Sequence, residues 1–395
     1  MLTSTGCKIR QGRLLQIMAA QKLDAVCVGA AWHVYYLTGF WPRWVHHAGA
    51  IVFSDGRVSL VAAEGTRASS AASKASPIAD GALNLAVDHI IEFEPAWMST
   101  LRQEQPSTIA KLLSAELQNR RCTAIATDTS AVTDALRDEI SASKLSLTGG
   151  RLSPAAETGR IDADLWQLRR RKESDELALM KMAIFACEEM YEKARQIIEP
   201  GIAELDVFAE LHRTAILTTG EPMTAFLGND YACGVPGGNA RNNRRAQAGE
   251  LYILDLGPTY RGYFADNARA ISVDRKPTDA QYQAWSHIVH ALKIVESMAK
   301  PSVRCRDIFA AVDEHFKQTR NTGMPHHLGH GVGLQPHEYP HLNPHWNDVL
   351  EEGDIFTAEP GQYSPGLAGG IRLENQYRVT ATGVECLVNS SLELV

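Results

Sequence analysis

The stretch "LYILDLGPTYRGYFADNARAI", Leu251 to Ile271, reads as two strands joined by a turn at Pro258–Gly262. Asp255 and Asp266 are 11 positions apart, a spacing that allows them to be directly opposed in a hairpin with an even loop length. The Cβ atoms of such a pair are about 4.5–5.5 Å apart. Because apolar residues flank both aspartates, we expect the pair to face the interior; two solvated carboxylates on a surface hairpin are the alternative.

Three further positions extend this acidic pair into a candidate metal site. His330 lies in "GHGVG", Glu359 lies in "TAEPG", and Glu374 lies in "GGIRLEN". Opposed buried carboxylates must share a proton or be balanced by a cation. Four carboxylates and one imidazole form an oxygen-rich set that suits Mn²⁺, Fe²⁺ or Co²⁺ and tolerates Zn²⁺. Two ions would offset four negative charges and could hold a hydroxide for hydrolysis.

The segment "HEYPH", His337 to His341, matches the HExxH pattern of zinc proteases. That pattern works on a helix, where residues four apart share a face and both histidines reach one zinc ion. Pro340 lies inside the segment, and a proline in a helix interior costs about 3 kcal/mol or more. We therefore predict that the two histidines share no helical face, which argues against this class of protease.

The composition favours a cytoplasmic protein of two domains. The chain has 395 residues, enough for two cores, and a net charge of −7, which argues against a nucleic-acid partner. We expect no membrane partner, because no apolar run approaches the roughly 18 residues of a spanning helix and no secretory signal is recognisable. The seven cysteines have no paired spacing, which is typical of reduced thiols.

The apolar patterns divide the chain into two expected domains. Residues 1–155 read as an α/β domain with strands and turns in "DAVCVG", "HVYYLTGF" and "GAIVFSDGRVSLV", and with a hairpin at Asp55–Gly56. A domain boundary is expected near 150–165, where the stretch "TGGRLSPAAETGRIDAD" interrupts the apolar pattern. Residues 165–395 read as an α+β domain with helices over an antiparallel sheet. Helices are expected at 8–21, 107–119, 174–198, 204–219, 278–299 and 305–319.

The ordered set of Asp255, Asp266, His330, Glu359 and Glu374 resembles the ligands of the pita-bread metallopeptidases, which include prolidase, aminopeptidase P and methionine aminopeptidase, with creatinase as a metal-free relative. The motifs "LDLG", "GHGVGLQPHE", "AEPGQY", "GGIRLEN" and "LRRRKESDELALMKMA" are similar to those of the family as well. The segment "AWHVYYLTGF" resembles the N-terminal domain of prolidase and creatinase. The resemblance covers most of the chain and implies a C-terminal pita-bread fold with an N-terminal α/β domain of creatinase type.

The resemblance also implies how the metal would be held. Asp255 would chelate one ion, and Asp266 and Glu374 would bridge two. His330 and Glu359 would bind the other ion, and Glu359 would also carry a proton to or from the attacking hydroxide. Manganese is the expected metal, with cobalt, iron and zinc as alternatives.

Substrate contacts follow from the same resemblance. His326 and His337 match family histidines that contact the substrate carbonyl and steady the tetrahedral intermediate. Arg372 matches an arginine that orients Glu374 or a substrate carboxylate. The other histidines of this region are expected in loop packing or in solvent: His327, His341 and His345.

One loop departs from the family pattern. Peptidase relatives carry a histidine in a "GxNAxxPH" loop before the first aspartate, whereas this chain reads "GVPGGNARNNRRAQAGELYILDLG". That histidine is the key base in creatinase-like relatives, so its absence argues against a metal-free amidinohydrolase. We expect an arginine of the loop to bind a substrate carboxylate or carbonyl, because a guanidinium suits bidentate recognition; a solvated basic turn is the alternative. The candidates are Arg241, Arg244 and Arg245.

The resemblance implies a metallopeptidase that cleaves small peptides or amides, most simply an Xaa-Pro peptidase of the prolidase or aminopeptidase P type, and that forms a homodimer. The altered loop keeps open a related hydrolase or lyase for a small non-peptide substrate, as in creatinase or ectoine hydrolase. A non-catalytic relative is the third alternative. The aromatic segment Trp32–Trp44 is expected either to reach over the site or to pack in a core.

Overall fold

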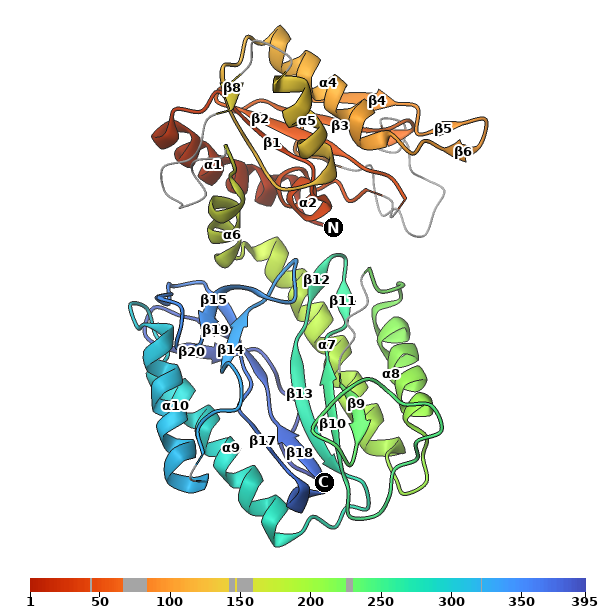
Figure 1. Ribbon diagram of the computed structural model, residues 1–395, viewed down its shortest axis with the longest axis vertical. Coiled ribbons are helices and arrows are strands. Elements are labelled where there is room, and N and C mark those ends of the chain that lie inside the picture. The colour runs from red at the N-terminus through yellow and green to blue at the C-terminus, as the bar shows by residue number, and fades with distance from the viewer. Residues whose placement is uncertain (43–44, 67–83, 142–145, 148–158, 225–229, 321) are drawn as a thin grey trace. The chain divides into compact units, whose positions relative to one another are not determined.

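The computed structural model describes residues 1–42, 45–66, 84–141, 146–147, 159–224, 230–320 and 322–395. Its internal contacts divide the chain into two compact units, Met1–Leu168 and Arg169–Val395 (Figure 1). The division falls inside helix α6, Asp162–Arg170. The sequence predicted domains at 1–155 and 165–395, and residues 148–158 of the expected linker lie outside the described residues. No helix in the described ranges is long and apolar enough to cross a membrane.

The N-terminal unit is built on a mixed sheet with the strand order β4-β3-β2-β1-β7-β8 in the part of the chain that the structure describes. β2 is antiparallel to β1 and β3, whereas β4 runs parallel to β3, and β7 runs parallel to β1 and β8. The strands are β1 Ala25–Val28, β2 Gly49–Phe53, β3 Val58–Ala63, β4 His89–Phe93, β7 Ala124–Thr127 and β8 Ser146–Leu147, and a small hairpin adds β5 Ala96–Trp97 and β6 Thr100–Leu101.

Helices of the N-terminal unit supply its core. α4 (Gln105–Asn119) and α5 (Ala131–Ser141) cover one face of the sheet, where Leu113 and Leu136 join Ile51 in one apolar cluster. α1 spans Ser4–Gln21 and begins earlier than the predicted residue 8. The hairpin predicted at Asp55–Gly56 is confirmed, because β2 pairs with β3.

The strand predicted in "HVYYLTGF" was wrong, because α2, Ala31–Thr38, is a helix. All residues from His33 to Thr38 are buried, so this segment has no exposed face and its period could not separate a buried helix from a buried strand. In the aromatic segment, Trp41 packs edge-on against Tyr35 with ring centroids 5.0 Å apart, which favours the packing alternative. Trp44 lies outside the described residues.

The C-terminal unit combines antiparallel sheets with two pairs of helices. One sheet has the order β13-β10-β9, a second has the order β15-β14-β16-β19-β20, and β11–β12 and β17–β18 form separate pairs. Its helices are α7 Ser174–Ile197, α8 Glu204–Thr219, α9 Asp279–Met298 and α10 Cys305–Arg320, and all four confirm predicted helices. Its strands are β9 Tyr231–Cys233, β10 Leu251–Leu256, β11 Thr259–Tyr260, β12 Tyr263–Phe264, β13 Asn267–Ser272, β14 Gly329–Gly331, β15 Glu338–Leu342, β16 Ile355–Ala358, β17 Gly361–Ser364, β18 Gly369–Arg372, β19 Asn375–Val379 and β20 Val384–Cys386.

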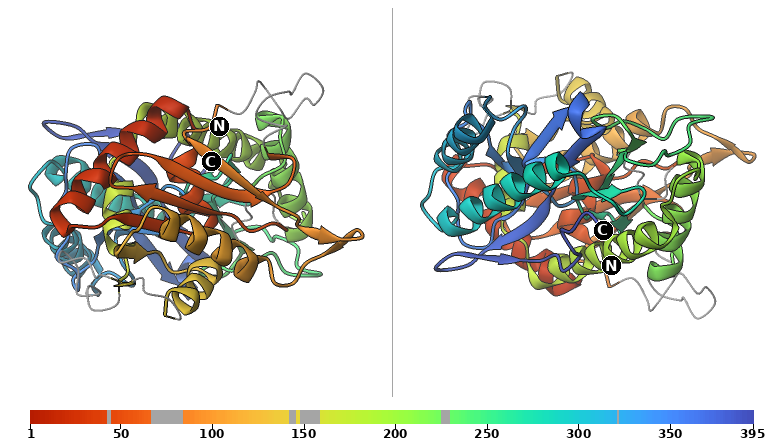
Figure 2. Two further views of the ribbon diagram at one scale, coloured as in Figure 1. Left: turned by 90° about the horizontal axis from the view of Figure 1, so that it is seen from above. Right: turned by 90° about the horizontal axis from the view of Figure 1, so that it is seen from below.

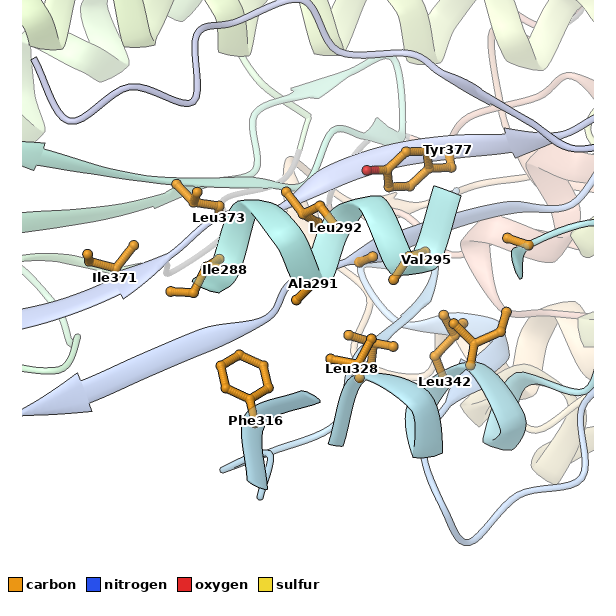
Figure 3. Packing of buried hydrophobic residues seen from close by; sticks show 14 of the residues in the cluster. Ile288, Ala291, Leu292, Val295, Phe316, Leu328, Leu342, Ile371, Leu373 and Tyr377 are labelled. Carbon is orange, nitrogen blue, oxygen red and sulfur yellow. The ribbon is translucent and has the colours of Figure 1, made fainter. Parts of the chain in front are cut away.

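Two apolar clusters attach these helices to the strands. The first joins α7 and α8 to β9 and β10. The second joins α9 and α10 to β15, β16, β18 and β19. Figure 3 shows residues of α9 between Ile371 and Leu373 on one side and Phe316 and Leu328 on the other, and Figure 2 shows α9 lying across the strands in the view from below. Packing against these helices holds the strands that carry the candidate ligands.

Candidate metal centre

A cavity of about 360 Å³ in the C-terminal unit gathers all five predicted ligands. Two of them come from strands, Asp255 from β10 and His330 from β14. The others lie in short connections, so residues more than a hundred positions apart meet here. The lining residues are Asp230, Asp255, Asp266, His326, His327, His330, Pro336, His337, Glu359, Arg372 and Glu374.

The hairpin with the two aspartates has a different register from the predicted one. Asp255 pairs with Ala268, so the prediction that Asp255 and Asp266 are directly opposed was wrong. The shift arises because the turn is itself a short hairpin, β11–β12, which closes at Arg261–Gly262 with positive φ at both residues. Side chains alternate along an extended chain, so residues 266 and 268 share a face and both aspartates still line the cavity.

His330 is held in a very narrow space. β14 lies between β15 and β16, and a Cβ at Gly329 or Gly331 would collide with the carbonyl of Thr357 or of Tyr339. Strands approach this closely only at residues without a side chain. His330 Nδ1 lies 3.0 Å from the carbonyl of Gly331, so Nε2 is the ring atom left to face the acids.

The donor atoms form two overlapping groups that fit divalent ions. In each of the sets Asp266–His330–Glu374 and His327–His330–Glu359, one ligand atom per residue lies within 4.8 Å of the others. Within the described part of the chain, the buried Glu374 Oε1 has no hydrogen-bond partner. An unpaired buried carboxylate oxygen is costly, and a cation would satisfy it. The donor set therefore fits the metal that the sequence predicts.

The acids of the cavity have strongly perturbed pKa values. Burial, followed by the charges of neighbouring acids, raises the pKa of Asp266 and of Glu374 well above the ordinary value. Burial also raises the pKa of Asp255, although the charge of Arg372 opposes the shift. Burial acts in the same sense on Glu359, but hydrogen bonds from His327 and His330 hold its pKa well below the usual range. Such opposed shifts within one cavity are typical of functional sites.

Arg372 connects the acids of the cavity to Tyr363 and, through it, to His326. Its Nη2 donates to Asp255 Oδ2 at 2.6 Å and also to Asp230, and its Nη1 donates to the Tyr363 hydroxyl at 3.0 Å. The Tyr363 hydroxyl in turn lies 3.0 Å from His326 Nε2. Arg372 thus lies beside the ligands, as the sequence predicted, but its hydrogen bonds go to Asp255 and Asp230.

The histidines divide into a cavity group and an outer group. His326 and His337 line the cavity as predicted, and the His337 ring stacks on His330 with centroids 3.7 Å apart. Burial, followed by the neighbouring histidines, lowers the pKa of His337 to about 4. His341 lies outside the cavity lining, with Nδ1 3.0 Å from Asp348 Oδ2, and it lies on the extended strand β15. The helical HExxH arrangement is therefore absent, as the proline predicted.

Two residues of the site were missed in the sequence. His327 was expected in packing or solvent, but its Nε2 lies 2.8 Å from Glu359 Oε1 inside the cavity. A bend at residues 325–326 lets both His326 and His327 face the site, and strand alternation does not predict this. Asp230 precedes β9 and carries no motif of its own, and only the pairing of β9 with β10 brings it beside Asp255.

The three loop arginines make local contacts. Arg241 pairs with Glu204 through Nε at 3.0 Å and Nη2 at 2.6 Å. Arg244 pairs with Glu250, and Arg245 Nη1 donates to the carbonyl of Gly201 at 2.8 Å. They do not belong to the described residues that line the cavity. Their role in substrate binding stays a prediction: alanine replacements should raise KM for carboxylate-bearing substrates, and an unchanged KM would assign them to the loop's own structure.

Comparison with known proteins agrees with this geometry. Residues 178–381 match the model of metallopeptidase family M24, and residues 10–160 match the creatinase/prolidase N-terminal domain. The chain belongs to metallopeptidase family M24. It is 29% identical over 246 residues to the Xaa-Pro dipeptidase of Pyrococcus furiosus, an alignment that covers 62% of this chain and 70% of the relative.

Solved structures extend this likeness to nearly the whole M24 chain. An Xaa-Pro dipeptidase from Bacillus anthracis matches with a TM-score of 0.77 and 22% identity, covering 98% of this chain and 99% of that one. An X-Pro aminopeptidase from Thermotoga maritima matches with a TM-score of 0.74 and 20% identity, covering 96% and 99%. The pita-bread fold with a creatinase-type N-terminal domain is confirmed, and the M24 family implies an enzyme with divalent metal ions.

Proposed function

We propose that this M24 enzyme is an Xaa-Pro peptidase of the prolidase or aminopeptidase P type. The observation that carries the proposal is the convergence of five donors on one cavity, with a buried Glu374 oxygen that lacks a hydrogen-bond partner in the described chain. The names of similar proteins add the preference for a bond before proline. Proline's tertiary amide has no N–H, which favours dedicated enzymes.

Asp255, Asp266, His330, Glu359 and Glu374 would hold two divalent ions, Mn²⁺ first, with Co²⁺, Fe²⁺ and Zn²⁺ as alternatives. When bound, the ions would polarise the scissile carbonyl and supply a bridging hydroxide as the nucleophile near neutral pH. The similarity to the prolidase and aminopeptidase family supports a homodimer. The seven free cysteine thiols support a cytoplasmic location.

The remaining cavity residues would bind the substrate and move protons. Because the pKa of His337 is about 4, its ring is neutral near pH 7 and offers one N–H to a developing oxyanion. His326 would act beside it, oriented by the Tyr363 hydroxyl. Glu359 is the candidate proton carrier, and His327, 2.8 Å away, is placed to exchange a proton with it.

A second candidate function has one specific observation in its favour. Counted from Gly237, the last position of the "GxNAxxPH" pattern falls on Arg244, which pairs with Glu250 and does not line the cavity. The lining therefore contains no histidine from this loop, which favours a related hydrolase or lyase for a small non-peptide substrate.

The two functions separate in one assay. Purified protein, stripped of metal and reloaded with Mn²⁺, is given Xaa-Pro dipeptides, longer Xaa-Pro peptides and a panel of small cyclic amidines and amides. Metal-dependent cleavage of the dipeptides supports a prolidase, and cleavage of longer peptides alone supports an aminopeptidase. Turnover confined to the small-amide panel would replace the peptidase proposal, and absence of turnover with bound metal would favour a non-catalytic relative.

A further inference from the structure

Asp230 is an acid of the cavity that the set of five donors does not include. It lies just before β9, and its backbone carbonyl accepts a hydrogen bond from the Asp255 N–H at 3.0 Å. Its carboxylate lines the cavity and accepts a hydrogen bond from Arg372. Asp230 and Asp255 thus lie side by side and share one guanidinium nitrogen, Arg372 Nη2.

The charge balance around Arg372 depends on this sharing. The side chain of Arg372 is only 11% exposed, and a guanidinium this buried needs a carboxylate partner. If Asp255 were the sole partner, Arg372 would compete with a divalent ion for the same carboxylate oxygens. Asp230 supplies the second carboxylate, so the charge of Arg372 stays neutralised when Asp255 binds a divalent ion.

The neighbouring loop is shaped around the Asp230 carboxylate. The N–H of Gly238 donates to Asp230 Oδ1 at 2.6 Å. A Cβ on Gly237 would lie 2.5 Å from Asp230 Oδ2 and 2.9 Å from its carboxyl carbon, closer than real side chains approach. Gly237 also has a φ of +152°. Two independent features, a hydrogen bond and a missing side chain, therefore hold this carboxylate against Arg372.

We propose that Asp230 is a positioning residue that shares the charge of Arg372 with Asp255 and thereby keeps Asp255 free to hold a divalent ion. This inference rests on the proposed metal site, but it concerns the affinity for the metal and not the substrate. It assigns to Asp230 a role between the ligand Asp255 and the arginine that faces Tyr363 and His326.

The first test measures metal affinity without turnover. Metal-free full-length protein is titrated with Mn²⁺ in a calorimeter. Asp230→Asn should weaken the affinity by about 10–100-fold, the range observed when a partner of a metal ligand is removed. Asp230→Glu keeps the charge, and its affinity for Mn²⁺ should be closer to that of the wild type. An Asn variant with wild-type affinity would overturn the proposal.

A double-mutant cycle separates this role from simple loss of negative charge. In the proposed arrangement Asp230 acts through Arg372, so Asp230→Asn should have little effect on Mn²⁺ affinity in an Arg372→Met background. If Asp230 acted only through its long-range charge, the same loss would appear with and without the arginine, and the positioning role would be disproved.

Two neighbouring glycines give a matched pair that leaves the charge unchanged. Gly237→Ala should push the Asp230 carboxylate off Arg372 and reproduce the effect of Asp230→Asn. Gly238 also has a positive φ, +126°, but a Cβ at this position would meet nothing within 4 Å. The variant Gly238→Ala therefore reports the effect of backbone strain alone. Equal losses in both variants would overturn the proposal. Failure of the wild type to bind Mn²⁺ would instead refute the proposed function.

Discussion

Two clusters of buried charge in the C-terminal unit differ in whether their carboxylates meet opposite or like charges. Around Glu338, the carboxylate lies against Arg169 and lies 3.4 Å from Lys172 Nζ, and all three side chains are 1% exposed. In the cavity, Asp266 and Glu374 are also buried but face further acids and histidines. A buried carboxylate with cationic partners is costly to remove, whereas buried carboxylates that face one another point to a divalent cation and hence to function.

The largest expected effect comes from removing one carboxylate of the cavity, where acids face acids. Glu374→Gln should abolish tight Mn²⁺ binding and lower kcat/KM by about a thousandfold or more, because metal catalysis supplies several kcal/mol. The metal-free variant should unfold at a higher temperature than metal-free wild type, since a repulsive buried charge is gone. Calorimetric titration and thermal unfolding measure both, and a lower unfolding temperature would contradict the comparison.

The same change at Glu338, where the carboxylate meets two cations, should lower the stability. Glu338→Gln leaves Arg169 and Lys172 without their carboxylate and should lower the free energy of unfolding by about 3–5 kcal/mol. Denaturant unfolding measures this loss. Folded protein should keep wild-type Mn²⁺ affinity, and a large drop in affinity would show that the cluster belongs to the metal site.

The pH dependence of stability should separate the clusters as well. Burial and neighbouring acids raise the pKa of Glu374 on folding, so its native form binds extra protons and its contribution to stability is lost as the pH rises above the ordinary carboxyl value of about 4. Glu338 is the reverse: burial opposes ionisation, but Arg169 and Lys172 lower its pKa, so its contribution is lost as the pH falls.

Unfolding temperatures of metal-free proteins between about pH 2 and pH 8 check these signs, because the Glu338 contribution is lost only below the ordinary carboxyl pKa of about 4. The gain of Glu374→Gln over the wild type should grow as the pH rises. The deficit of Glu338→Gln should shrink as the pH falls. Parallel curves for the two variants would mean that neither carboxyl changes its pKa on folding.

The smallest of these effects concerns two histidines that each contact one carboxylate. His327 faces Glu359 in the cavity, and His341 faces Asp348 outside it. His327→Ala should lower kcat by about a hundredfold, because it removes a proton-exchange partner of Glu359. His341→Ala is the matched control and should keep kcat within about twofold. Steady-state kinetics at saturating Mn²⁺ decide, and equal effects would remove His327 from the mechanism.

Much of the site could be predicted because its residues lie in motifs with physical meaning. His330 lies between glycines, and Glu359 and Glu374 follow strand patterns, so each drew attention, and the ordered set of five was more specific than any one motif. The direct pairing of Asp255 with Asp266 was wrong because the β11–β12 turn sets the register, and a turn's internal pairing is not visible in the apolar pattern.

The remaining differences have similar local causes. The buried helix α2 was mistaken for a strand because a run of buried residues without an exposed face has no readable period. His327 depended on a bend before β14, and Asp230 on the pairing of β9 with β10. Contacts that depend on a backbone bend, or on which strands pair in a sheet, cannot be predicted from the apolar pattern and become visible only in the structure.

The glycines on either side of His330 set a limit for anyone who wishes to alter the metal preference of this enzyme. Because Gly329 and Gly331 fit directly against neighbouring carbonyls, the backbone at position 330 cannot shift to suit a donor of another length. A replacement ligand must therefore reach the ion from a fixed Cα, through the geometry of its own side chain. Redesign of selectivity at this position is a question of side-chain reach alone.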